Sequence, residues 1–180
     1  TLTGSDLVTY LNPSGSSFTS SSGVWSSAAI EKTSSGSGIN VRILNYNGQN
    51  NITTITANQY RNAAVTAGIT DANIYVTSAI PIDGSGALAG IYKAYAKSGE
   101  KLNQKQITAA QDELNTLSGI TKENKGKDGY SDAQLNNAVA GAKKEMAQKG
   151  SNITKNQIIT IVNNQIENNN LTNVITNEQK

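Results

Sequence analysis

The feature that most constrains the fold of this chain is a change of hydrophobic period within residues 54–95, from helix to strand and back to helix. The first helix is predicted to open at Thr56, with Gln59 three positions later, a pair that caps the first amides of a helix. Gly68 follows the last helical position and predicts the end of this helix. A chain with this order needs both a sheet and helices.

The strand of this segment is predicted over residues 73–80, where Ile74 and Val76 share one face. Pro81 ends the strand, and a second helix is predicted from about residue 86 to residue 96.

Two further extended segments are predicted upstream, at residues 24–32 and 39–46. In the second, Ile39 and Val41 alternate with polar residues. Because a Gly/Ser loop at residues 33–38 separates the two segments, we expect them to pair as a hairpin.

Three more helices are predicted downstream, and each opens with a capping residue and a glutamine three positions later. Their predicted first residues are Asn103, Ser131 and Thr154. The whole pattern predicts an α+β fold: a small sheet, made of the hairpin and one further strand, with a helix crossover and a mostly helical C-terminal half. We expect a loose N-terminal segment at residues 1–23, an α/β core at 24–100 and a helical region at 101–180 packed on the core.

Composition excludes several classes of chemistry. The 180 residues include no cysteine and no histidine, so ordinary zinc and haem sites, thiol catalysis and histidine triads are ruled out. Net charge is +2, and the two arginines, Arg42 and Arg61, are not part of any basic run, which argues against nucleic-acid binding. We predict no cofactor, although oxygen ligands for calcium or magnesium remain available.

The ends and the apolar content of the chain suggest export. No stretch approaches the roughly 20 apolar residues of a membrane-spanning helix. The chain opens TLTGSDLVTYLN, without an initiating methionine or a basic-then-apolar leader, as expected after removal of a signal peptide. We therefore expect a secreted, extracellular protein, with association to the cell wall as a further possibility.

The most suggestive loop lies between the predicted strand and the second helix, at Asp83, Gly84, Ser85 and Gly86. Free amides at the start of a helix attract anions, so these four residues are our candidate ligand-binding site. The loop is not a Walker motif, and Lys93 lies well inside the helix. The competing interpretation is that Asp83 or Ser85 caps the helix and that the glycines shape the turn.

Two other motifs fail on their own requirements. Ser98 and Lys101 have the S-x-x-K spacing of serine acyl enzymes, but the S-D-N and K-T-G elements are missing. Residues 124–130 resemble the start of a calcium loop, yet Gly126 and Leu135 stand where oxygen ligands are required. We interpret the first as coincidence and the second as an interhelical turn, and predict no catalytic and no metal-binding residue.

Acidic and aromatic residues leave two weaker hypotheses. Carboxylates for a glycosidase pair are available at Glu31, Asp71, Asp83, Asp112 and Glu113. Aromatic residues for a carbohydrate-stacking platform are available at Trp25, Tyr46, Tyr75 and Tyr92. The simpler alternatives are surface acids and core or half-buried sheet aromatics.

Several ordered strings resemble the YpuA-like family of secreted proteins from Gram-positive bacteria. They are GSGINV at residues 36–41, YRNAAVTAGI at 60–69, DANIYV at 71–76 and PIDGSGALAGI at 81–91. The resemblance covers residues 3–117 well and the C-terminal helices more loosely. It implies export after signal-peptide cleavage, but the family is a domain of unknown function, so no site residue is implied. Where members often read Ser-Gly-Thr-Ala, residues 83–86 read Asp-Gly-Ser-Gly.

Together these observations predict a non-enzymatic binding or interaction module, whose partner is a cell-envelope polymer or a surface protein. The alternatives are an envelope hydrolase that uses carboxylates, or Ser98 with Lys101, and a carrier of a small anionic ligand.

Overall fold

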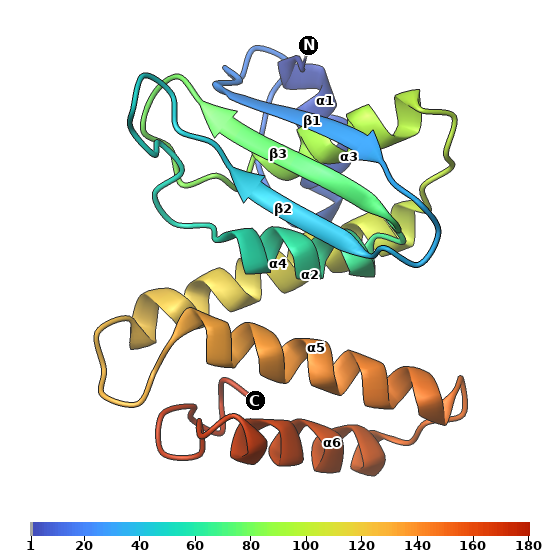
Figure 1. The fold of residues 1–180 in the computed structure, drawn as a ribbon, viewed down its shortest axis with the longest axis vertical. Coiled ribbons are helices and arrows are strands. Elements are labelled where there is room, and N and C mark those ends of the chain that lie inside the picture. The colour runs from blue at the N-terminus through green and yellow to red at the C-terminus, as the bar shows by residue number, and fades with distance from the viewer. Residues whose placement is uncertain (1) are drawn as a thin grey trace. The chain divides into compact units, whose positions relative to one another are not determined.

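The computed structural model describes residues 2–180, and its ribbon is drawn in Figure 1. It contains two compact units, the first ending at Thr116 and the second spanning Leu117–Lys180. The α+β class with a helical C-terminal half is confirmed. The boundary between the units falls inside helix α4 (Gln104–Asn124), later in the chain than the predicted boundary at residue 100. The reason is that the first part of α4 contributes buried residues such as Leu114 to the core of the first unit.

The first unit contains a mixed three-stranded sheet. Its strands are β1 (Ser26–Lys32), β2 (Ile39–Ile43) and β3 (Ala72–Ser78), in the order β1-β3-β2. Strand β1 is antiparallel to β3 and β2 is parallel to it. The predicted hairpin of the first two segments is therefore wrong, because β3 lies between them (Figure 1).

The loop after β1 explains how β3 reaches the centre. Rather than closing a hairpin, this loop bonds to the start of β3: the backbone N–H groups of Thr33 and Gly38 donate to the carbonyl and the carboxylate of Asp71. From the end of β2 the chain passes through helix α2 (Ala57–Thr66) before it enters β3. This helix is the crossover connection that two parallel neighbouring strands require.

Helices cover one face of this sheet. Helices α1 (Gly4–Leu11) and α3 (Ala87–Lys97) lie behind it in Figure 1. Burial alternates strictly along β3. Its buried positions meet a core of mostly aliphatic residues, which includes Tyr60, Ala63, Ala64, Ile69, Ala72, Ile74, Val76, Leu88, Ile91, Tyr92, Ile107 and Leu114.

The second unit is helical. It contains the end of α4, then α5 (Asp132–Lys149) and α6 (Lys155–Asn168), as predicted. Ser131 and Thr154 cap the last two helices. Their hydroxyl oxygens accept hydrogen bonds from the backbone N–H groups of the glutamines three residues later in the chain. Its core contains Leu117, Ile120, Leu135, Ala138, Ile166, Leu171 and Ile175. Across the described residues, no helix combines the length and the apolar character needed to cross a bilayer.

The N-terminal segment is not loose, contrary to our expectation for residues 1–23. It contains α1 and a 3₁₀ turn (Asn12–Ser14), and Leu7 and Leu11 are buried against Ala89 of α3. Two leucines four residues apart place one apolar stripe on a short helix, which suffices to dock it.

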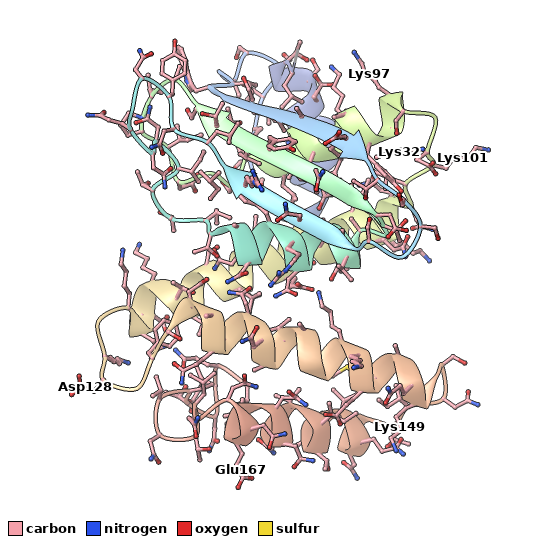
Figure 2. The ribbon with its side chains drawn as sticks, viewed as in Figure 1. Lys32, Lys97, Lys101, Asp128, Lys149 and Glu167 are labelled. Atoms are coloured by element: carbon pink, nitrogen blue, oxygen red, sulfur yellow. The ribbon has the colours of Figure 1, made fainter. Side chains whose placement is uncertain are left out.

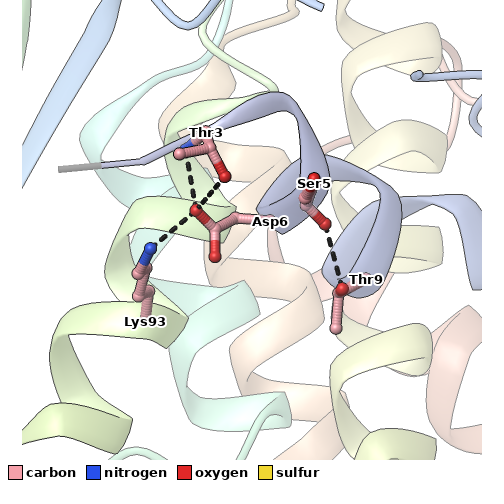
Figure 3. A network of polar contacts seen from close by, with 5 residues as sticks. All are labelled: Thr3, Ser5, Asp6, Thr9 and Lys93. Atoms are coloured by element: carbon pink, nitrogen blue, oxygen red, sulfur yellow. Dashed lines mark hydrogen bonds and ion pairs between the residues drawn. The ribbon is translucent and has the colours of Figure 1, made fainter. Parts of the chain in front are cut away.

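A polar network fixes α1 to α3 (Figure 3). The backbone N–H of Thr3 donates to Oδ2 of Asp6 at 2.7 Å, and Nζ of Lys93 donates to the same oxygen at 2.6 Å. The bond from Lys93 is the main cause that holds the pKa of Asp6 below its usual value, and the bonds from Thr3 add to it. One carboxylate thus caps α1 and pairs with the neighbouring helix.

Replacing this carboxylate is expected to destabilise the protein in a pH-dependent way. Because the pKa of Asp6 is lowered in the folded state, its contribution is complete above the unfolded value of about 3.9 and is lost as pH falls through the native value. Asp6→Asn should cost about 1 kcal/mol of unfolding free energy at pH 7 and much less near pH 2. Denaturant titration at both pH values measures this.

Glu100→Gln is the matched control, since Glu100 forms an exposed ion pair with Lys32. Its cost should be close to zero at either pH. An Asp6→Asn penalty of the same size at both pH values would contradict the role of the charge.

Candidate binding surface

The predicted anion loop is a turn closed by its own side chain. Oδ1 of Asp83 accepts hydrogen bonds from the backbone N–H of Ser85 at 3.0 Å and from its hydroxyl at 3.1 Å. The N–H of Ala87 donates to the carbonyl of Gly84. The carboxylate of Asp83 therefore occupies the Ser85 amide that an anion would use and adds negative charge to the loop.

Gly84 lies in this turn for a steric reason. Its φ is +102°, and an added Cβ would stand 2.5 Å from the Tyr60 hydroxyl and 2.6 Å from Ile52. The Tyr60 hydroxyl donates to the Gly84 carbonyl, and burial raises the pKa of Tyr60, so the hydroxyl remains a donor. This glycine lets the loop pack against the core.

The other polar candidates have local structural partners. Ser98 follows the end of α3, and its hydroxyl donates to the Tyr95 carbonyl at 2.7 Å. In the residues 124–130 turn, Nζ of Lys127 donates to Oδ1 of Asn124 at 2.9 Å. The lysine ammonium thus bonds to the oxygen that would be the first ligand of a calcium ion. Within residues 2–180, the structure brings no three acidic side chains together as a metal site would require.

The candidate aromatic residues separate into two groups. Tyr92 is fully buried in the core, against the ring of Tyr10. Trp25 and Tyr46 are 58% and 44% exposed, and Tyr75 is partly exposed on β3. Of the four, Tyr92 therefore cannot contribute to a surface platform.

The helices of the first unit leave one face of the sheet uncovered (Figure 1). Tyr75 belongs to this face, because it lies on the central strand β3 between the buried residues Ile74 and Val76. Strand register sets its neighbours: Ala29 of β1 on one side and Arg42 of β2 on the other. The next row is Glu31, Asn73 and Asn40. We call this surface the open face; it comprises Ser27, Ala29, Glu31, Asn40, Arg42, Asn73, Tyr75 and Thr77.

Charges on the open face are separated. The Glu31 carboxylate accepts a hydrogen bond from the Asn73 amide at 3.0 Å, and the Tyr75 hydroxyl lies 3.5 Å from it. The side chain of Arg42 is exposed, and its guanidinium forms no hydrogen bond or ion pair with any residue from 2 to 180. The face therefore presents an unpaired guanidinium beside an aromatic ring, with amides and hydroxyls around them.

Comparison with known proteins places the chain in a family. The family model described as "protein of unknown function (DUF1002)" matches residues 1–180. The chain belongs to this family. It is also 33% identical over 156 residues to the uncharacterized protein YpuA of Bacillus subtilis, which confirms the predicted YpuA-like resemblance.

That alignment covers 77% of the chain and 52% of YpuA, so the chain spans about half the length of this relative. No solved structure matches the chain. Family membership therefore supplies no activity and no site residues.

Sequence reasoning missed the open face because it requires the strand register. Alternation along each strand indicates which residues share a face, but only the pairing places Arg42 and Glu31 on either side of β3. The available signal was the alternation of apolar and polar residues in the segments that form β2 and β3.

Gly84→Ala is expected to destabilise the protein more than Gly99→Ala. Both glycines have positive φ, but nothing lies within 4 Å of a Cβ at Gly99, whereas one at Gly84 overlaps core atoms. Backbone strain should cost about 1 kcal/mol in each, with about 2 kcal/mol more at Gly84 for overpacking. Thermal and urea unfolding measure the difference, and equal losses would contradict the close packing of this turn.

Proposed function

We propose that this protein is a secreted, non-enzymatic binding module of a Gram-positive cell envelope, and that the open face binds a carbohydrate polymer of that envelope. The single observation that carries the proposal is the composition of the open face around Tyr75 and Arg42. A rigid sheet holds these groups in place, so little ordering is needed on binding.

The side-chain chemistry of the open face suits a chain of sugars. An aromatic ring offers an apolar face for the C–H side of a sugar, and its hydroxyl offers a polar edge. Around Tyr75, the amides of Asn40 and Asn73 and the hydroxyl of Ser27 can exchange hydrogen bonds with sugar hydroxyls. A flat face also admits an extended polymer, which a closed pocket would not.

The charge of Arg42 further limits the kind of glycan that the open face is expected to bind. Arg42 supplies a guanidinium that can bond a carboxylate or phosphate on the polymer. Trp25, two residues before Ser27 in the chain, is 58% exposed and extends the aromatic content near this end of the sheet. These features favour a glycan that places an anionic group beside Arg42, away from the Glu31 carboxylate in the neighbouring row.

The proposal is tested by sedimentation with purified Gram-positive cell-wall sacculi. Arg42→Ala and Tyr75→Ala should each weaken binding about fivefold or more, as expected for central contacts. Arg61→Ala is the matched control, because Arg61 lies on α2 and bonds to Asn58 outside the open face. Its binding should equal that of the unaltered protein.

Trp25 gives an independent readout, since it is the only tryptophan in the chain. Addition of solubilised wall glycan should shift its emission and protect it from acrylamide quenching. Equal binding by all variants, or release of soluble sugars from the sacculi, would overturn the proposal; the latter would instead indicate a hydrolase.

A further inference from the structure

A hollow lies beside strand β1 on the first unit, and it shares Ser27 with the open face. It has a volume of about 390 Å³, within the range of ligand sites. Its lining is five small or apolar residues, two serines and two lysines: Leu2, Val24, Ser26, Ser27, Ala28, Gly90, Lys93, Ala94 and Lys97. We call this hollow the β1 groove.

The position of β1 shows which part of the strand the groove follows. Ser26, Ser27 and Ala28 are consecutive, and side chains of consecutive strand residues point to opposite faces. A hollow that contacts all three therefore runs along the edge of the strand. Among residues 2–180, β3 is the one strand that pairs with β1, so the other edge of β1 has no strand beside it.

Two of the residues that α3 contributes to the lining of the groove, Gly90 and Ala94, are small. A Cβ at Gly90 would stand 3.0 Å from Leu2 and 3.1 Å from Ala28, so glycine permits their close approach. Ala94 follows four residues later, on the same side of the helix. Gly90 is therefore covered by Leu2 and Ala28, and the apolar wall of the groove is made by Leu2, Val24, Ala28 and Ala94.

The rim of the groove carries one uncompensated positive charge. Lys93 is paired with Asp6 at 2.6 Å. Lys97 lies one turn further along α3, is exposed, and forms no ion pair with any residue of the described chain (Figure 2). A ligand that fills the groove is therefore favoured if it places a negative charge near Lys97.

We infer that the β1 groove docks an extended acidic peptide, which adds to the open edge of β1 and places a carboxylate against Lys97. An unpaired strand edge supplies backbone donors and acceptors for an added strand. Alternate side chains of that strand would enter the apolar part of the groove, which is lined by Leu2, Val24 and Ala94. This site is distinct in ligand and chemistry from the open face, and its failure would leave the proposed glycan function untouched.

The test is titration of the ¹⁵N-labelled protein with capped heptapeptides of alternating valine and threonine, each carrying one glutamate at a different position. Amide shifts are expected at Ser26–Ala28 and along α3. The same peptides with lysine in place of glutamate should bind at least tenfold more weakly. N-methylation of alternate backbone amides should abolish binding, because it removes the donors that a strand needs.

Charge reversal supplies the matched variants. Lys97→Glu should invert the preference so that lysine peptides bind better, whereas Lys101→Glu should leave it unchanged, since Lys101 is separate from Lys97 (Figure 2). Both residues are exposed, and circular dichroism confirms folding. The inference is overturned if no glutamate peptide shifts the groove amides, if N-methylated peptides bind equally, or if the shifts arise from self-association through β1.

Discussion

The first unit depends on the double pairing of strand β3. Its alternate residues Ala72, Ile74 and Val76 are at most 1% exposed, and it has a hydrogen-bonded neighbour on each side. Burial of one face and pairing of both edges leave this strand a single register, since a one-residue slip would turn the apolar side chains to the outside. The helices that pack on β3 and the exposed polar row around Tyr75 both follow from that register.

Local polar contacts decide which of the polar side chains singled out in the sequence remain free to bind a ligand. The Asp83 carboxylate bonds within its own turn, and the Lys93 ammonium bonds to Asp6. A motif gives residue types at a spacing, whereas a site needs groups whose hydrogen-bonding capacity is not already used. Arg42 and Lys97 satisfy that condition, and neither belongs to a recognised motif.

Strand β1 contributes to both proposed surfaces because it lies at an edge of the sheet. Its outward side chains Ala29 and Glu31 belong to the open face, while its free edge borders the β1 groove. The face carries aromatic, amide and paired acidic groups, and the groove carries small apolar groups with a lysine rim. One short strand therefore presents two chemistries to solvent, which a central strand cannot do.

The sequence by itself determined helices α2 to α6, the caps of α2, α5 and α6 and the α+β class, because capping pairs such as Thr154 with Gln157 and apolar spacing act within a few residues. It did not determine the partners of the strands. Tertiary structure placed β3 between β1 and β2, docked α1 through Leu7 and Leu11, and brought Arg42 beside Tyr75. Those outcomes depend on burial and pairing between distant segments, which local pattern does not contain.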